Sequence, residues 1–370
     1  MLNSVLLQLK KLESIGRISN DTPFYYSYRS NSWLGLKRRD DNIFFPASIA
    51  FILKRSMYLF DQDEQPVAER IIERIISGYS EYRNSQRISY NFWKRKDNSW
   101  FPNGLLMHRF KHFALPDDVD TTAMILLTNK SGKEEVEILH NILPNYSNGF
   151  KQWLKNGHKP FHRLNTYSTW FGDRMPIETD VCVLCNLLYL ILENNIDLNQ
   201  HDQAVIDMVG QIIDQRLYYH RPFAISPEYP KPEVIIYHIS RLTGKFPGII
   251  NERLRSRLIE DINKCDTWNN GMSRMLMELS LLYLNAFNGT PETTQMPDLK
   301  KGDWWFTAGL LSVYNNRMLQ LLAPGGLFHF RFYCNAYIFT LFIEHQLLLR
   351  KKEKSYSNNP SSLISNNIED

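Results

Sequence analysis

Six strongly apolar segments at helical spacing constrain the fold of this chain more than any other feature of its sequence. Each follows a polar or proline-containing stretch, and the Val/Ile/Thr alternation that is typical of strands is nearly absent. The segments begin near Phe44, Asp118, Thr179, Lys231, Asn270 and Arg331. Helices that are apolar on most faces have to be buried. We therefore predict an all-α protein built around these six segments.

Amphipathic, more charged helices are expected between the apolar ones. They cover residues 64–77, 134–141, 201–218, 251–265 and 303–322. Buried and half-exposed helices that alternate six times predict an (α/α)6 toroid of six helical hairpins, with an inner and an outer ring. In such a toroid the inner helices begin at one mouth, where helix dipoles favour negative charge. The acids that would face a common cavity there are Asp118, Asp120, Glu178, Asp180 and Glu233.

The same pattern predicts the domain organisation. We expect an N-terminal helical segment and entry loop over residues 1–43, a single α/α-barrel domain over 44–349, and a disordered tail over 350–370, which is too polar to bury apolar surface.

Composition narrows the class of protein. Hydrophobic residues make up 43% of the chain, enough for a sizeable core, and the net charge of +4 is spread over scattered Lys and Arg. No basic stripe indicates nucleic-acid binding, and no apolar stretch is long enough for a membrane span. The four cysteines do not suggest a disulfide framework, which favours a cytoplasmic protein.

Three carboxylates crowd together where the second apolar helix begins. Asp117, Asp118 and Asp120 follow Leu115-Pro116 and precede an apolar run. One of them can cap the helix, and we assign this role to Asp117. Like charges at this spacing repel, which favours one carboxyl that keeps its proton, as a Brønsted acid at neutral pH must.

The run Asp118-Val119-Asp120-Thr121-Thr122-Ala123 resembles the D-x-D-D-T-A signature of class II terpene cyclases, in its D-x-D-T-T form. In that family the motif begins an inner helix of an α/α barrel, and its middle aspartate protonates an alkene or epoxide of a polyprenyl chain. The resemblance implies that Asp120 is the general acid and that Asp118 orients it. Thr121 and Thr122 would hold the acid, and Thr121 stands where the commoner motif has a third aspartate.

The resemblance also implies a function. We expect an enzyme of isoprenoid biosynthesis, a terpene cyclase of the isomerase or lyase class, that cyclises a linear C15 or C20 prenyl diphosphate. A diphosphate requires convergent basic groups, usually with Mg2+, and a carbocation requires aromatic faces. The expected substrate-binding residues are Arg174, Arg221, Asp180, Trp170, Trp304 and Trp305. Most members of this family have two barrels, so a homodimer or a partner subunit could complete the site of a single one.

Part of the sequence resembles a zinc site, but we do not expect it to bind zinc. Asp180, Cys182 and Cys185 resemble part of the zinc site of protein prenyltransferases, with His238 as a distant ligand. His238 lies well inside its helix, so we expect no zinc and two buried helical cysteines.

Two other functions stay open. An (α/α)6 carbohydrate-active enzyme would pair Asp118 or Asp120 with Glu178, Asp180 or Glu228 as acid and base. A toroid without catalytic activity would bind a prenyl lipid or a protein.

Overall fold

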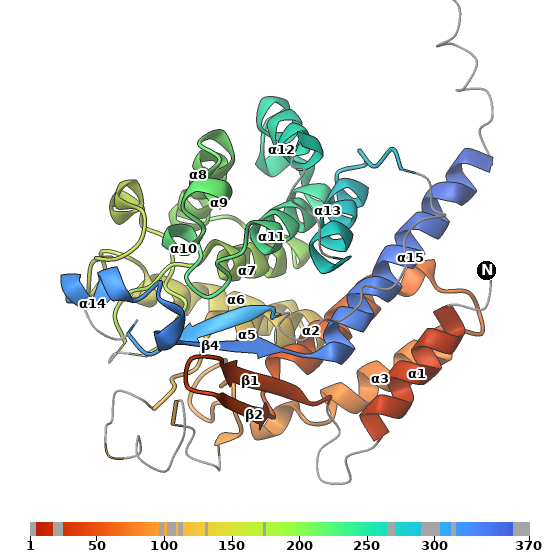
Figure 1. The fold of residues 1–370 in the computed structure, drawn as a ribbon, viewed down its shortest axis with the longest axis horizontal. Helices are drawn as coiled ribbons and strands as arrows, with labels where there is room; N and C mark the ends of the chain where they lie inside the picture. Colours follow the sequence, from red (N-terminus) through yellow and green to blue (C-terminus); the bar gives the residue numbers. More distant parts are fainter. Residues whose placement is uncertain are drawn as a thin grey trace, which may run out of the picture.

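The computed structural model describes residues 5–17, 25–95, 100–101, 109, 114–129, 132–172, 175–264, 271–289, 304–311 and 316–357. Within these ranges the protein is mostly helical, as predicted (Figure 1). The helices are α1 (Val5–Arg17), α2 (Phe44–Arg55), α3 (Gln65–Ile76), α5 (Val119–Thr128), α6 (Lys133–Ile142), α7 (Val181–Glu193), α8 (Gln200–Asp214), α9 (Leu217–His220), α10 (Pro222–Ile225), α11 (Pro232–Lys245), α12 (Glu252–Lys264), α13 (Gly271–Tyr283), α14 (Arg317–Leu322) and α15 (Asn335–Ser357).

The six apolar segments form six helices that contact one another in a cycle. α2 packs against α5, α5 against α7, α7 against α11, α11 against α13, α13 against α15, and α15 against α2. Local chemistry sets where they begin: Asp118 and Asp180 cap α5 and α7, and Pro232 opens α11, where a missing N–H costs no hydrogen bond. Every residue of α5 is buried, which accounts for its uniformly apolar sequence after the motif.

The amphipathic helices pack against the helices of this cycle. α3 contacts α2, α8 contacts α7, α12 contacts α8 and α13, and α1 contacts α15 and α3. In α3 the buried residues are Val67, Ala68, Ile71, Ile72 and Ile75, which form one helix face. The predicted positions of α3, α6 and α12 agree closely with the structure, whereas the helix expected over residues 201–218 ends at Asp214 and is followed by the short α9.

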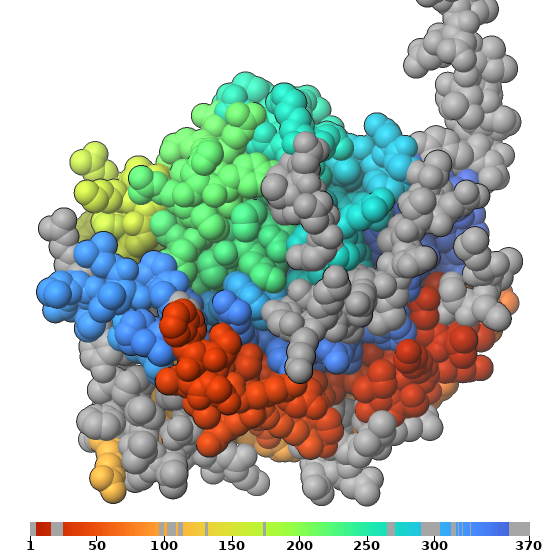
Figure 2. Space-filling view, viewed as in Figure 1, coloured from red at the N-terminus to blue at the C-terminus, as the bar shows by residue number. Residues whose placement is uncertain are grey.

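A four-stranded antiparallel sheet contradicts the prediction of a purely helical chain. Its strands β1 (Ser27–Asn31), β2 (Leu36–Asp40), β3 (Phe306–Gly309) and β4 (His329–Tyr333) lie in the order β2-β1-β4-β3. Tyr28 lies opposite Tyr333, and Phe306 lies opposite Phe332. The sheet therefore joins an N-terminal hairpin to a C-terminal one, and Figure 2 shows the red N-terminal segment against the blue C-terminal segment.

Two helix predictions are wrong near this sheet. The helix expected over residues 303–322 is replaced by β3 and the short α14, and the helix expected from Arg331 begins only at Asn335. Buried Phe330 and Phe332 alternate with half-buried Arg331, which is the period of a strand. Phe306 stacks on Phe332 with ring centroids 4.7 Å apart, so the aromatic pair stabilises β3 against β4.

The C-terminal helix is longer than predicted. α15 continues to Ser357, so residues 350–357 are helical where a tail was expected, and residues 358–370 lie outside the described ranges. None of the helices in the described ranges combines the length and the apolar character that crossing a lipid bilayer requires.

Candidate functional site

The candidate site lies where α5 and α7 begin, beside the sheet. An inner cavity of about 60 Å³ is walled mainly by aromatic side chains, and its ionisable groups include Asp118, Asp120 and Glu228. The rings come from α2, from the segments before α5, α7 and α11, and from β3 and β4: they are Phe44, Phe92, Trp93, Phe101, Trp170, Tyr229, Phe306 and Phe332. The start of α5 thus supplies Asp118 and Asp120, the loop before α11 supplies Glu228, and the sheet supplies part of the aromatic wall.

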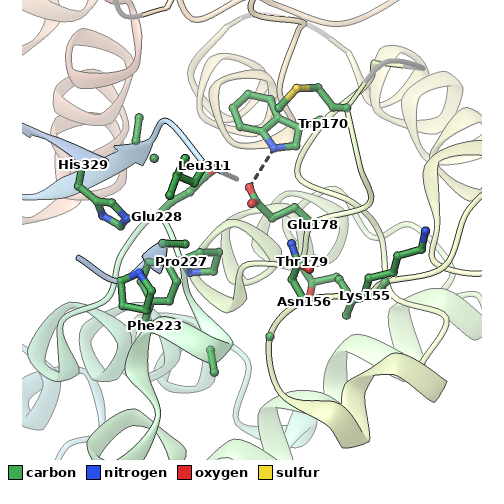
Figure 3. A pocket seen from close by; sticks show the side chains of 18 of the residues that line it. Lys155, Asn156, Trp170, Glu178, Thr179, Phe223, Pro227, Glu228, Leu311 and His329 are labelled. Atoms are coloured by element: carbon green, nitrogen blue, oxygen red, sulfur yellow. Dashed lines mark hydrogen bonds between the residues drawn. The ribbon is translucent and has the colours of Figure 1, made fainter. Parts of the chain in front are cut away.

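A larger outer cavity of about 930 Å³ adjoins the inner one (Figure 3). The two cavities share Phe101, Leu115, Trp170, Glu228 and Ala308 as lining residues. Among its other lining residues are the basic groups Lys155, Lys159, His162, Arg221 and His329. A ligand in the outer cavity would therefore meet cations on one part of the wall and the acids of the inner cavity at another.

Asp120 is buried and bonded through both of its carboxyl oxygens. Its Oδ1 accepts a hydrogen bond from Asn186 Nδ2 at 2.6 Å, and its Oδ2 accepts one from the Tyr229 hydroxyl. Burial raises the pKa of Asp120 above its ordinary value, while these two hydrogen bonds and the charge of Arg241 act in the opposite direction. The net effect is an acid that holds its proton more tightly than an exposed aspartate does.

Asp118 caps α5, which corrects the prediction that Asp117 does so. Its Oδ1 accepts a hydrogen bond from the Thr121 backbone N–H at 2.6 Å. The other oxygen, Oδ2, is buried and has no hydrogen-bond partner among the described residues. Burial, reinforced by the charge of Asp120, raises the pKa of Asp118 to about 8.

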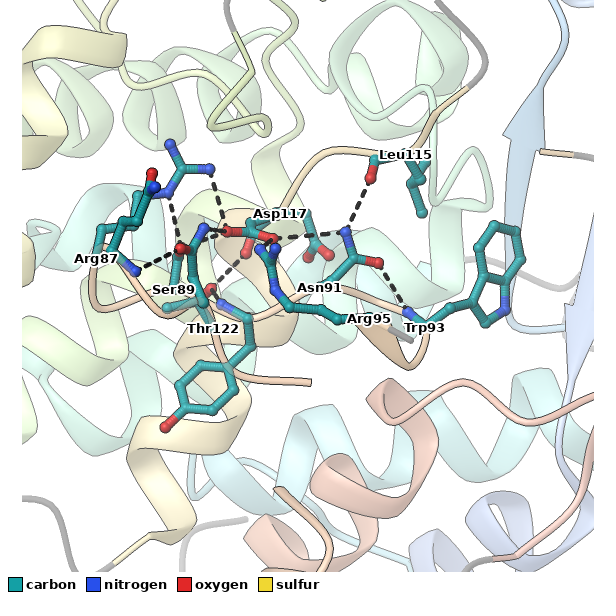
Figure 4. A network of polar contacts seen from close by, with 12 residues as sticks. Arg87, Ser89, Asn91, Trp93, Arg95, Leu115, Asp117 and Thr122 are labelled. Atoms are coloured by element: carbon teal, nitrogen blue, oxygen red, sulfur yellow. Dashed lines mark hydrogen bonds and ion pairs between the residues drawn. The ribbon is translucent and has the colours of Figure 1, made fainter. Parts of the chain in front are cut away.

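Asp117 instead organises the segment that walls the inner cavity (Figure 4). Its carboxylate accepts hydrogen bonds from Asn84 at 2.6 Å and Ser89 at 2.5 Å, and it forms ion pairs with Arg87 at 3.1 Å and with Arg95. Burial alone would raise the pKa of Asp117, but these hydrogen bonds and charges hold it below its ordinary value. The contacts fix the backbone that carries Phe92 and Trp93 into the inner cavity.

What we call the carboxyl cluster consists of Asp118, Asp120 and three more acids, which are Glu178, Asp180 and Glu228. Trp170 Nε1 donates to Glu178 at 3.0 Å, and Asp180 accepts from Ser226 Oγ at 2.7 Å and from the Glu228 N–H at 2.9 Å. Burial raises the pKa of all three added acids, that of Asp180 to about 7. The charges of the other cluster members raise the pKa of Glu228 further.

The motif threonines support the helix start and not the acid. Thr122 Oγ1 donates to the Asp118 carbonyl at 2.6 Å and accepts from the Tyr90 N–H at 3.0 Å. Thr121 contributes the N–H that Asp118 caps. The residues that bond Asp120, Asn186 and Tyr229, were missed from the sequence, although Asn186 is the lone amide within a long apolar run.

The predicted substrate-binding residues lie in different parts of the structure. Arg221 and Trp170 line the outer cavity, whereas Asp180 is buried in the cluster. Trp304 lies beneath Lys231, whose Nζ is 4.3 Å from the ring centroid, and Trp305 is fully buried against Tyr337. Arg174 lies outside the described residues.

Glu233, which was expected to face the cavity with the other acids, accepts a hydrogen bond from Ser273 at 3.0 Å.

Cys182 and Cys185 are buried in α7, as predicted. Burial raises the pKa of both thiols, that of Cys185 to about 12, and lowers that of His238. His238 Nδ1 lies 2.8 Å from the Val234 carbonyl within its own helix. The described residues include no group of three or more His, Cys, Asp or Glu side chains placed to hold a metal ion. The absence of bound zinc stays a prediction.

Searches against protein-family models, characterised proteins and solved structures return no match to this chain. Its function therefore has to be argued from the chemistry of the site.

Proposed function

We propose that this protein is a protonation-initiated terpene cyclase with Asp120 as its general acid. The observation that carries the proposal is a buried, hydrogen-bonded Asp120 that opens into a cavity walled by aromatic rings. An acid with a raised pKa can hold a proton at neutral pH, and ring faces stabilise a cation without attacking it. The cyclic contacts of α2, α5, α7, α11, α13 and α15 support an (α/α)6 toroid as the scaffold.

The first step is a proton transfer from the Asp120 carboxyl to the terminal alkene or epoxide. The alkene's π electrons form the new C–H bond, which leaves a tertiary cation on the substrate and a carboxylate on Asp120. Asn186 and Tyr229 donate hydrogen bonds to that carboxylate, so they stabilise it where the charge develops. Ring faces stabilise the cation by about 0.5–2 kcal/mol each. Loss of a proton from the cyclised cation to a base balances the reaction, which is an isomerisation.

The outer cavity supports a prenyl diphosphate as substrate. Its volume of about 930 Å³ is of the size that encloses small-molecule ligands. Lys155, Lys159 and Arg221 line it and form no ion pair with any other described residue, so they are available to an anion. The prenyl chain would run from these cations past Trp170 to Asp120. Magnesium ions bind through substrate phosphates and few carboxylates, so Mg2+ is expected to enter with the diphosphate.

Product analysis tests the proposal. The protein is incubated with geranyl, farnesyl or geranylgeranyl diphosphate and Mg2+, the products are dephosphorylated, and the alcohols are identified by mass spectrometry. We expect a cyclic alcohol, and Asp120→Asn should lower its formation by about 10²–10⁴-fold because the variant has no proton to transfer. Asp207→Asn, on the exposed face of α8, is the matched control. Equal turnover by wild type and Asp120→Asn would exclude Asp120 as the acid.

One observation favours a second function. Glu178 and Glu228 both line the outer cavity beside the Trp170 ring, as the paired acids of a carbohydrate-active enzyme would. Cleavage of an oligosaccharide that Glu178→Gln abolishes, without conversion of any prenyl diphosphate, would support this alternative. Binding of a prenyl diphosphate without any product would instead indicate the non-catalytic role.

A further inference from the structure

Asp120 is connected through one amide to a buried arginine on a neighbouring helix. Asn186 in α7 donates from Nδ2 to Asp120, and its Oδ1 accepts a hydrogen bond from Arg241 Nη2 in α11. Asn186 and Arg241 are 1% and 3% exposed, so solvent screens this chain of contacts much less than it would at the surface. The amide dipole therefore has its negative end at the cation and its positive end at the acid.

Arg241 has no carboxylate partner of its own among the described residues. Its guanidinium lies over Phe51 and Tyr237, at 5.2 and 5.3 Å from the ring centroids, and its Nε is buried without a hydrogen-bond partner. Arg55 lies over the same Phe51 ring at 5.0 Å but forms an ion pair with Glu344. The buried Arg241 and the part-buried Arg55 thus share one ring, and of these two only Arg55 forms an ion pair with a described carboxylate.

We propose that Arg241 is a positioning residue for the proton transfer: acting through Asn186, it orients the Asp120 carboxyl and stabilises the carboxylate that remains when the proton has left. A buried cation favours the charged form of a nearby acid, and the effect is large in a low-dielectric interior. The hydrogen bond to Asn186 also excludes the flipped amide, which would present an oxygen to Asp120. The inference rests on the role proposed above for Asp120.

Several ionisable groups bear on the same carboxyl and have to be held constant in a test. Besides Arg241, they are Asp118 from the start of α5, Asp180 and Cys182 from the start of α7, and Glu228 and Tyr229 from the segment before α11. Substitutions at Asn186 and Arg241 leave the other groups in place.

The test measures the titration of Asp120 without substrate. Infrared difference spectra across a pH series report protonated carboxyl groups, and the band lost in Asp120→Asn is assigned to Asp120. Arg241→Met should raise the apparent pKa of Asp120 by about one unit, which is a tenfold weaker acid. Asn186→Leu, which leaves Arg241 in place but removes the amide link, should shift it in the same direction. Arg241→Lys keeps the charge and should restore part of the effect.

Arg55→Met is the matched control, since it removes a part-buried arginine from the same aromatic ring. An unchanged Asp120 titration in both Arg241→Met and Asn186→Leu, or an equal shift in Arg55→Met, would overturn the proposal. Circular dichroism checks that each variant folds. Where a prenyl substrate is turned over, the limb of the pH–rate profile that reports Asp120 should move to higher pH in Arg241→Met. If no substrate is turned over, the proposed function fails. The infrared titration still tests whether Arg241 acts on the Asp120 carboxyl.

Discussion

Asp117 and Asp118 are adjacent in the chain, yet their surroundings give their carboxyl groups opposite properties. Asp117 is surrounded by donors and two arginines, whereas Asp118 has one buried oxygen for which the described residues provide no hydrogen-bond donor. The pKa of Asp117 is lowered and that of Asp118 is raised to about 8. Asp117 is therefore suited to anchoring the cavity wall, and Asp118 to keeping a proton beside Asp120.

Asp117→Asn should lower the free energy of unfolding by about 1–3 kcal/mol, because it leaves buried donors and two arginines without their charged partner. A depressed folded-state pKa contributes stability above the unfolded pKa, and this contribution is lost as the pH falls through the folded pKa. Urea unfolding at neutral and acidic pH measures both effects. The difference from wild type should shrink toward acidic pH, and a difference independent of pH would contradict the ion-pair explanation.

The raised pKa values of Asp118 and Asp180, about 8 and about 7, predict that the protein loses stability as the pH rises. The folded state binds more protons than the unfolded state between the unfolded pKa near 4 and these values, so unfolding becomes easier across that range. Thermal unfolding from pH 5 to pH 8 should show a falling midpoint. Asp118→Asn, which can still cap α5, should flatten this slope, and an unchanged slope in the variant would contradict the assignment.

At the site, the sequence identified the residues of the motif but not the residues that form hydrogen bonds with Asp120. Asp118 and Asp120 were singled out because their spacing matches a known signature, and both line the inner cavity. Asn186 and Tyr229 reach Asp120 from 66 and 109 positions away along the chain. Such contacts depend on how α7 and the segment before α11 pack against α5, which no local pattern specifies.

Gly244 permits a close approach between two helices, where α11 meets α13. A Cβ added there would lie 2.5 Å from the Tyr283 carbonyl oxygen and 2.9 Å from its Cβ. Gly244→Ala should therefore force the helices apart and cost about 1–3 kcal/mol of unfolding free energy. Gly248→Ala, with no atom within 4 Å of the added carbon, is the control and should change little. Equal stability of the two variants would mean that the helices shift freely.

The elements predicted well are those whose signal is long and local. The helices α5, α7 and α11 are at least ten residues long and begin at a capping aspartate or a proline, so their existence and starts follow from sequence. The strands are four or five residues long, and β1 pairs with β4 across most of the chain. A short alternation such as that around Phe330 is ambiguous until its partner strand is known.

For the whole molecule, the proposed function requires an anion to bind in the outer cavity, at the end away from Asp120. A variant with Lys155, Lys159 and Arg221 all changed to Ala should bind inorganic diphosphate at least tenfold more weakly in calorimetry, because it loses three cations from the wall. Lys264→Ala on α12 is the control, since that lysine pairs with Glu260. Unchanged affinity in the triple variant would place the anion elsewhere and leave the role of Asp120 to be tested by itself.

The pairing of β1 with β4 and the packing of α2 against α15 also determine the order in which the protein can fold during translation. β1 and the apolar face of α2 emerge from the ribosome early, but β4 and α15 are made near the end of synthesis. Exposed strand edges and apolar surface in such intermediates promote aggregation. Nascent chains that stop before residue 329 should therefore be bound by chaperones and digested by proteases, and both sensitivities should disappear once α15 has been released.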